Sequence, residues 1–195
     1  MVDVFLNQIL NVRKLALNNE KTFQLNDSNC DWLKFLLSEI EQLPGSSQDP
    51  PQDTHKDSYL NIDIKIVKKD NSELLEHIFL EGSIDCFYKT SCIRCLNDMN
   101  DSFTIDFKAC FIPKILEKNE IYADQLTIYA NSEEMELYFY EEQIIDLKEF
   151  FHEQISLNIN QFPLHSEECK GMCQVCGENL NEKICVHQQE NCCTL

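Results

Sequence analysis

The 195-residue chain contains only four glycines and no apolar run longer than four residues. The shortage of glycine excludes a glycine-rich loop of the kind that cradles phosphate groups. Without a long apolar run, the sequence predicts neither a transmembrane helix nor a signal-peptide core. Basic residues are scarce too: 16 Lys and Arg stand against 34 Asp and Glu, a formal net charge of −18. This balance argues against a protein whose main affinity comes from neutralising nucleic-acid phosphates.

Signatures of common enzymes are also missing. The chain has no Gly-x-Ser-x-Gly nucleophile elbow, and no pair of carboxylates stands out as acid and base. Hydrophobic residues nevertheless make up 43% of the chain and aromatic residues 10%, which is enough to build a folded core. We therefore expect a non-enzymatic, cytoplasmic protein with no membrane partner and no small-molecule substrate.

The spacing of apolar residues changes along the chain from a helical period to a strand period. A stripe from Trp32 to Leu43 has helical spacing and follows Ser28-x-x-Asp31, which resembles a capping box. Apolar and polar residues then alternate, which predicts half-buried antiparallel strands, and Asp146-x-x-Glu149 predicts the start of another helix. The expected fold is α+β: an antiparallel sheet with packed helices and a cysteine-rich C-terminal tail. The alternating segments are 62–66, 78–88, 103–111 and 135–139.

These patterns divide the chain into four segments. Residues 1–43 form an N-terminal segment of strands and one helix. Residues 44–58 hold three of the five prolines and almost nothing apolar, which is typical of a linker or mobile loop. Residues 59–163 form the sheet core with its helix, and residues 164–195 form the tail.

Eleven cysteines are present, an odd number in a sequence without an export signal. This combination argues against a disulfide framework and favours metal or thiol chemistry. Cys30, Cys86 and Cys110 stand singly in apolar surroundings, so we expect unreactive buried thiols there. Cys192 and Cys193 lie among the last four residues, where an exposed tail is expected.

The other cysteines, together with two histidines, have the spacing of metal ligands. The pair Cys92 and Cys95 falls between two strand patterns, so the tip of a hairpin can aim both thiolates at one point. The pair Cys173 and Cys176 is followed by Gly177, which lets backbone amides turn toward the sulfur. Zinc takes four tetrahedral ligands. We therefore predict two zinc ions, one held by Cys92, Cys95, His165 and Cys169, the other by Cys173, Cys176, Cys185 and His187.

Other interpretations of these residues stay open. Both Cys-x-x-Cys pairs could share a single zinc site, and thiolates also hold iron–sulfur clusters, although the histidines favour zinc. The alternative function is that of a thiol-based redox or metal-transfer protein. A thioredoxin-type pair needs a helix start after a buried parallel strand, and neither pair has that setting. A zinc deaminase is disfavoured because only five residues separate His165-Ser166-Glu167 from Cys173 and the required proline is absent.

Acidic residues are concentrated in one part of the chain. Residues 120–168 contain twelve Asp and Glu but a single Lys. Such a segment is either a solvated face or a docking surface for a basic protein. The candidate partner-binding residues are five of these carboxylates and the arginine of the first cysteine pair: Glu133, Glu134, Glu136, Glu141, Glu142 and Arg94.

Both cysteine pairs lie in longer motifs. The first is Cys92-x-Arg94-Cys95-Leu96, and the second, at 168–181, reads ECKGMCQVCGENLN. Over residues 60–187 the chain resembles the YceD family of large-subunit ribosomal RNA accumulation proteins. The resemblance implies a non-enzymatic factor for 23S rRNA accumulation and large-subunit assembly, which the predicted zinc ions would stabilise. Family members often carry Cys at the positions of His165 and His187, an exchange that a zinc site tolerates and a disulfide does not.

The strongly acidic composition bears on how such a factor would reach ribosomal RNA. A net charge of −18 disfavours direct binding to the phosphates of the RNA. We therefore expect contact with a ribosomal or ribosome-maturation protein that is basic, and only an indirect association with 23S rRNA.

Overall fold

The computed structural model describes residues 5–41, 58–183 and 185–189. The chain divides into two compact units, each made of separate stretches of sequence. Most of the predicted linker, residues 44–57, lies outside the described residues, as do Cys192 and Cys193. The predicted division into four segments stays a prediction. The first unit comprises Met1–Leu36, Tyr59–Cys86 and Phe103–Ile159, and the second comprises Leu37–Ser58, Phe87–Ser102 and Asn160–Leu195.

A six-stranded sheet with the order β3-β4-β5-β6-β8-β7 is the main element of the fold. Side chains of β4 alternate as the sequence predicts: Ile62, Ile64 and Ile66 are buried, whereas Asp63 between them is exposed. One face of the sheet therefore lies on a core. The strands are β3 (Glu20–Asn26), β4 (Tyr59–Asn71), β5 (Leu75–Ser91), β6 (Asp98–Pro113), β7 (Thr127–Ala130) and β8 (Glu133–Tyr140).

One pair of strands differs from the predicted antiparallel arrangement. Ala109–Pro113 of β6 run parallel to Glu136–Tyr140 of β8. A parallel pair needs a crossover of about a dozen residues or more. Residues 114–132 supply that crossover, and they contain the 3-10 helix η2 (Lys114–Lys118) and the strand β7. The sheet is consequently mixed, although β3 with β4 and β7 with β8 are antiparallel.

A small antiparallel sheet joins the start of the chain to the second helix. It contains β1 (Phe5–Leu6), β2 (Ile9–Asn11) and β9 (Ile144–Asp146), and the 3-10 helix η1 (Val12–Lys14) follows β2. The amide of Leu147 donates to the carbonyl of Gln8 over 3.0 Å. These strands therefore fix the position where helix α2 (Leu147–Asn158) begins.

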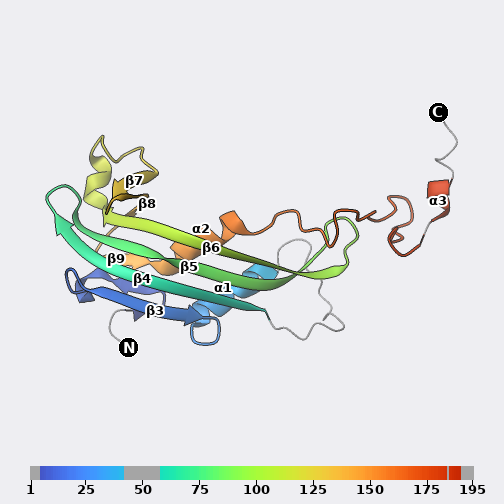
Figure 1. The fold of residues 1–195 in the computed structure, drawn as a ribbon, viewed down its shortest axis with the longest axis horizontal. Coiled ribbons are helices and arrows are strands. Elements are labelled where there is room, and N and C mark those ends of the chain that lie inside the picture. Colours follow the sequence, from blue (N-terminus) through green and yellow to red (C-terminus); the bar gives the residue numbers. More distant parts are fainter. Residues whose placement is uncertain (1–4, 42–57, 184, 190–195) are drawn as a thin grey trace. The chain divides into compact units, whose positions relative to one another are not determined.

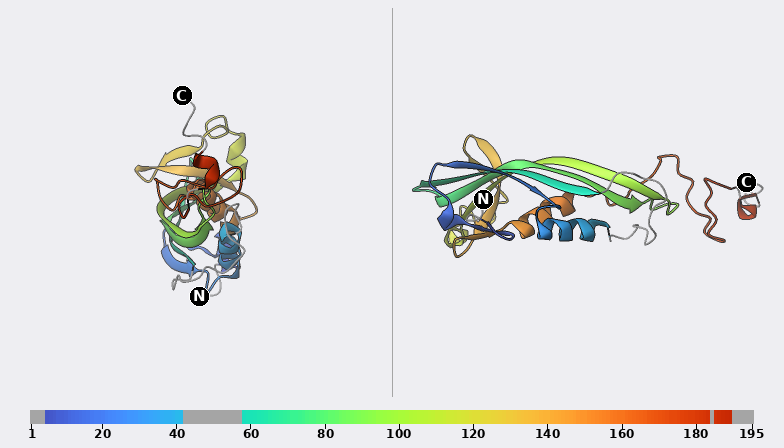
Figure 2. Two further views of the ribbon diagram at one scale, coloured as in Figure 1. Left: turned by 90° about the vertical axis from the view of Figure 1, so that its right-hand side faces the viewer. Right: turned by 90° about the horizontal axis from the view of Figure 1, so that it is seen from below.

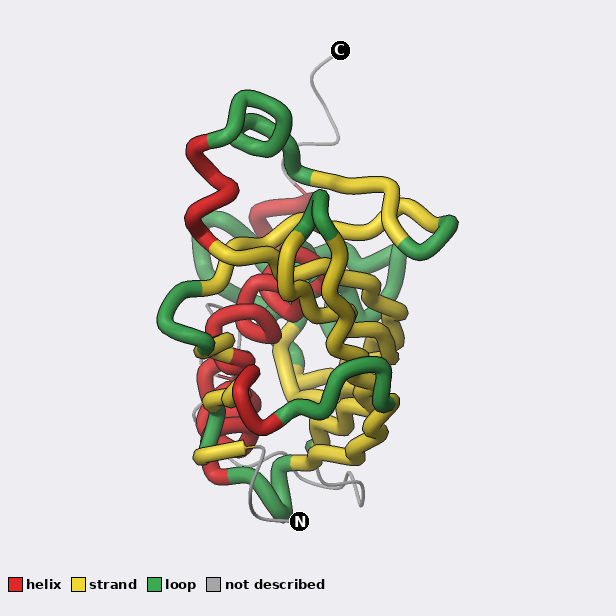
Figure 3. The backbone as a smooth tube through the Cα atoms, turned by 90° about the vertical axis from the view of Figure 1, so that its left-hand side faces the viewer, coloured by secondary structure: helices red, strands yellow, loops and turns green. Residues whose placement is uncertain are grey.

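The helix α2 and the first turns of α1 (Asp31–Glu41) cover the same face of the sheet (Figures 1 and 2). Trp32 of α1 stacks on Phe151 of α2 with ring centroids 6.1 Å apart. Phe107 of β6 meets Phe150 and Phe151 edge-on, at 5.6 and 5.3 Å. Figure 3 shows the turns of these two helices on one side of the long strands. The predicted α+β fold with helices packed on a sheet is confirmed.

The two helices start differently. Asp146 caps α2 as predicted, because its side chain accepts hydrogen bonds from the amides of Lys148 and Glu149. The capping box predicted at Ser28 is wrong, because α1 begins at Asp31. The carbonyl of Cys30, just before the helix, accepts the first backbone hydrogen bonds of the helix. Reciprocal bonds between Asn26 and Asn29 close a turn there instead. Leu43 of the predicted stripe lies outside the described residues.

Two of the three single cysteines are fully buried, as expected. Cys86 and Cys110 have no exposed surface, and burial raises the pKa of Cys110 to about 12. Cys30 is only half-buried, and burial raises the pKa of its thiol as well. Among the described residues, no helix is long and apolar enough to cross a membrane.

Candidate metal centres

The first Cys-x-x-Cys pair lies where β5 leads into β6. These strands are neighbours in the sheet and only residues 92–97 join them, so they form an antiparallel hairpin. The amide of Cys92 donates to the carbonyl of Asn97 at 2.9 Å, and the amide of Leu96 donates to that of Cys92 at 2.8 Å. Leu96 has a φ of 60°, in the left-handed region. This tight turn places Cys92 and Cys95 at the hairpin tip, as the sequence predicts.

The C-terminal segment, which follows α2, supplies two side chains that complete a group of four at this hairpin tip. The candidate ligand atoms of Cys92, Cys95, His165 and Cys169 all lie within 4.8 Å of one another. The sulfurs of Cys92 and Cys169 are 3.7 Å apart, and the Cys95 sulfur is 3.3 Å from Nδ1 of His165. Tetrahedral zinc thiolates have sulfurs about 3.8 Å apart, whereas bonded sulfurs lie about 2.0 Å apart. The spacing therefore fits a shared metal ion.

Backbone contacts hold the C-terminal segment on the hairpin. The amide of Ile93 donates to the carbonyl of Pro163 at 3.0 Å. The guanidinium of Arg94 donates through Nη1 to the carbonyls of Glu167 and Cys169, at 3.4 and 3.3 Å. A charged donor strengthens such bonds. Arg94 thus positions Cys169, and its predicted partner-binding role stays a prediction.

Gly171 allows the close approach of the segment to Arg94. Its φ is 73°, a conformation that residues with a Cβ rarely adopt. A Cβ atom at this position would also lie only 3.1 Å from the carbonyl oxygen of Arg94. Both the backbone conformation and the available space therefore require glycine here.

The second Cys-x-x-Cys pair repeats the turn of the first. The amide of Gly177 donates to the carbonyl of Cys173 at 2.8 Å, and the amide of Cys173 donates to that of Glu178 at 2.9 Å. Gly177, with a φ of 73°, takes the place of Leu96. The Cys173 sulfur is 4.0 Å from Nδ1 of His187, in the short helix α3 (Val186–Gln189). The ligand atoms of the whole group, Cys173, Cys176, Cys185 and His187, lie within 4.8 Å of one another.

The two Cys-x-x-Cys pairs thus fall into separate groups of four in the described part of the chain. The structure brings together the same two sets of side chains that the spacing predicts, and their division between two metal ions stays a prediction. Either group could hold a metal ion, because each offers three sulfurs and one imidazole nitrogen.

Two asparagines of the second motif, which sequence reasoning missed, bond to the hairpin and to the first group. Asn179 donates through Nδ2 to the side-chain oxygen of Asn97 in the hairpin, at 2.9 Å. Asn181 donates to the sulfur of Cys169 at 3.5 Å and accepts from the amide of Lys170 at 2.8 Å. Both belong to the Asn-Leu-Asn that ends the second motif, so the motif itself was the signal that could have found them.

Hydrogen bonds from nearby amides favour one thiolate in each group. Burial opposes ionisation of Cys92, but the His165 side chain and amides including that of Arg94 outweigh it and lower the pKa of Cys92 to about 5. Amides of Cys176 and Val175 lower the pKa of Cys173 to about 6. The turns therefore present thiolates, the form that binds metals.

The second cysteine of each turn behaves in the opposite way. Burial, and then the neighbouring Cys169 and Cys92, raise the pKa of Cys95 to about 11. At Cys176 the amide of Glu178 lowers the pKa, but the neighbouring Cys173, burial and Cys185 together outweigh it, so the pKa is raised. A cation placed between the sulfurs would remove this repulsion.

Two of the five predicted acidic residues form ion pairs within the first unit. Glu133, the first residue of β8, pairs with Lys108 of β6. Glu141 follows β8 and pairs with Lys114 over 3.1 Å. Both pairs are largely exposed, and pairs of this kind contribute little to stability.

The other three carboxylates differ in their surroundings. Glu134 accepts a hydrogen bond from the hydroxyl of Thr127. Glu136 accepts from the Tyr138 hydroxyl at 3.0 Å and from Gln154 at 2.6 Å. Glu142 forms no ion pair or hydrogen bond with any described residue. The role of these five residues in partner binding stays a prediction.

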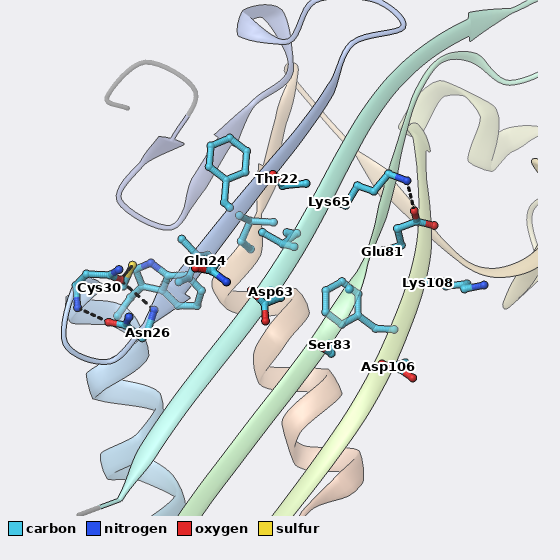
Figure 4. A pocket seen from close by; sticks show the side chains of 18 of the residues that line it. Thr22, Gln24, Asn26, Cys30, Asp63, Lys65, Glu81, Ser83, Asp106 and Lys108 are labelled. Atoms are coloured by element: carbon cyan, nitrogen blue, oxygen red, sulfur yellow. Dashed lines mark hydrogen bonds and ion pairs between the residues drawn. The ribbon is translucent and has the colours of Figure 1, made fainter.

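A cavity of about 1510 Å³ lies over β3–β6 and is lined only by residues of the first unit. Figure 4 shows Lys65 and Glu81 pointing toward each other from neighbouring strands, 2.7 Å apart. Lys65 also pairs with Glu20 at 2.9 Å, and the bonds to Glu81 and Glu20 raise the pKa of Lys65. Because its lysines are already paired with carboxylates, this cavity offers no free cation to a ligand.

Comparison with models of known families shows a match over more than half of the chain. The family described as "Large ribosomal RNA subunit accumulation protein YceD" matches residues 80–192, more than half of the 195 residues. The matched range begins in β5 and includes all eight residues of the two groups. Comparison with curated proteins gives no match, and neither does comparison with solved structures.

Proposed function

The chain belongs to the YceD family, and we propose that it is a non-enzymatic factor for 23S rRNA accumulation and large ribosomal subunit assembly. The family match over residues 80–192 carries this proposal. The net charge of −18 favours action through a basic ribosomal or maturation protein. Association with the RNA would then be indirect, because phosphates repel an acidic surface.

We further propose that each group binds one zinc ion. Three thiolates and one imidazole are a donor set that zinc prefers, and the 3.7 Å between the sulfurs of Cys92 and Cys169 fits tetrahedral coordination. Four protein ligands leave no open position for a substrate, as in structural zinc sites. The role proposed for zinc is therefore to order the C-terminal segment on the hairpin.

Depletion of the protein tests this function. We expect mature large-subunit rRNA to fall relative to small-subunit rRNA, and the wild-type chain to restore the ratio. The Cys92→Ser/Cys95→Ser variant should fail to restore it, because the first group would lose two ligands. Cys30→Ser, outside both groups, is the matched control and should restore the ratio. An unchanged rRNA ratio after depletion would contradict the proposal.

A thiol-based redox or metal-transfer function is the second candidate, favoured by two observations. The pKa of Cys92 is lowered to about 5, and Cys176 is exposed. Alkylation separates the candidates: structural zinc is stoichiometric and protects the thiols, whereas a redox pair is metal-free and has one reactive thiol. We expect the protected, zinc-loaded form.

A further inference from the structure

A second cavity, of about 430 Å³, lies in the first unit beside the end of β8, β9 and the first turns of α2. Three of the aromatic rings that line it pack on one another. Phe111 and Tyr138 stack with centroids 5.1 Å apart, and Phe150 meets them edge-on at 5.5 and 5.2 Å. Clustered rings of this kind attract cations through the electron density of their faces.

Five carboxylates line the cavity around these aromatic rings, and no cationic side chain lines it. Of the five, Glu141 is paired and Asp146 caps α2. The carboxylates of Glu142, Glu149 and Glu153 make no ion pair or hydrogen bond with any described residue. Three negative charges therefore border an aromatic cavity without a positive charge among them.

The placement of two of these carboxylates on α2 has an energetic cost. Glu149 and Glu153 are four residues apart, so they lie on one face of the helix and repel each other. The negative potential reaches the aromatic rings: burial, then the charge of Glu136 and more weakly that of Glu153, raises the pKa of Tyr138. A cation bound between the carboxylates would relieve the repulsion.

We propose that this cavity binds an arginine side chain of a basic partner protein. Phe111 and Phe150 are only 4% and 3% exposed, so the half-buried Tyr138 is the ring on which a planar guanidinium can stack while it donates to the surrounding carboxylates. The cavity is large enough for a single side chain and falls within the usual range for ligand pockets. Only the identity of the partner, a ribosomal or maturation protein, rests on the proposed function.

The test uses the full zinc-loaded chain and a blocked peptide of alternating arginine and glycine. The matched peptide carries citrulline, which keeps the shape of arginine but lacks its charge. We expect the arginine peptide to shift the NMR signals of Tyr138 and Phe150 and the citrulline peptide to leave them in place. Calorimetry at physiological salt then gives the affinity of each peptide.

Two double variants distinguish binding at this cavity from a general effect of the chain's negative charge. Glu149→Gln/Glu153→Gln should weaken arginine-peptide binding by about fivefold or more, since two charge pairs are lost. Glu120→Gln/Asp124→Asn removes the same charge from the turn before β7 and should change binding by less than about twofold. Circular dichroism confirms that each variant is folded.

Equal weakening in both double variants, or equal binding of both peptides, would overturn the inference. Signals that shift only outside the cavity would overturn it as well. These outcomes are independent of the rRNA ratio after depletion, which tests the proposed function alone. An unchanged ratio together with arginine binding at Tyr138 would overturn that function and leave the cavity inference standing.

Discussion

Leu96 and Gly177 hold the same position in the two Cys-x-x-Cys turns, with φ values of 60° and 73°. A left-handed conformation costs an ordinary residue about 1–2 kcal/mol. The second turn avoids that cost by using glycine, whereas the first accepts it with a leucine that is 58% exposed. The first turn lies on a hairpin between long strands, which hold its backbone in place.

Gly177→Ala should therefore weaken metal binding by the second group. A Cβ atom there meets only the Cε of Met172, at 3.9 Å, so the cost is conformational and not steric. We expect about 1 kcal/mol, or about a fivefold loss of zinc affinity, measured by competition with a chromophoric chelator. Leu96→Gly is the matched control and should not weaken the first group. Unchanged affinity in Gly177→Ala would contradict this account of the turn.

The lowered pKa values predict how the metal-free protein responds to pH. Thiols of the unfolded chain titrate near 9.0, whereas the pKa of Cys92 is about 5 and that of Cys173 about 6. Between these values the folded state binds fewer protons, so stability rises with pH. The contribution is fully present above pH 9 and is lost as the pH falls through 6 and then 5.

Thiolate absorbance of the chelated protein checks this directly. We expect an early step between about pH 5 and 6 that corresponds to two thiolates. Cys92→Ser and Cys173→Ser should each remove half of that step. If all thiols titrated together near pH 9, the hydrogen bonds of the two turns would not stabilise thiolates.

At the scale of whole elements, the sequence pattern was informative wherever one face of an element is buried. The alternation in β4 and the stripe of Phe150, Phe151 and Ile155 in α2 follow from the burial of one face of each element. The parallel pairing of β6 with β8 was not predictable, because a crossover sets it and not a local pattern. The pairing of β2 with β9 joins residues too far apart in sequence for periodicity to reveal.

The start of α1 shows that a competing local turn can prevent a capping box from forming. Ser28-x-x-Asp31 has the residues of a capping box, but the reciprocal bonds between Asn26 and Asn29 form a turn that includes Ser28. Asparagine competes well for such backbone bonds. The helix therefore starts at Asp31, three residues after the predicted cap.

The candidate metal groups were predictable for a different reason. Ligand spacing within a turn is a local property, so Cys92 with Cys95 and Cys173 with Cys176 could be paired from sequence alone. The closeness of Arg94 to Gly171, and the bonds of Asn179 and Asn181, depend on how separate segments meet. No local pattern encodes those contacts.

Removal of metal should loosen the C-terminal segment and leave the sheet folded. The second unit has small clusters built on cysteine, such as Cys173 with Leu180 and Cys185, where the first unit has aromatic rings. Metal must therefore supply most of the order between the parts of residues 164–187, whereas the hydrogen bonds inside each Cys-x-x-Cys turn are local and persist without metal. Hydrogen exchange with and without chelator should show faster exchange there and unchanged protection in β4 and β6. Uniform loss of protection across the sheet would contradict this picture.

On the scale of the whole molecule, charge and metal have separate roles. We propose that the charge of −18 favours the approach of basic partners, and salt, which screens charges beyond about 8–10 Å, would then weaken that attraction. The two Cys/His groups lie in the second unit, and the aromatic cavity lies in the first. Partner recognition can then be altered by substitutions that leave the metal ligands in place.

The zinc content of the protein purified without chelator tests the central claim most directly. The account predicts about two equivalents per chain, because each group supplies four ligands. Cys92→Ser/Cys95→Ser and Cys173→Ser/Cys176→Ser should each retain about one equivalent, since the groups are separate. A wild-type chain that contains no zinc would contradict the account. A wild-type chain with one equivalent of zinc would also contradict it if both double variants contained none.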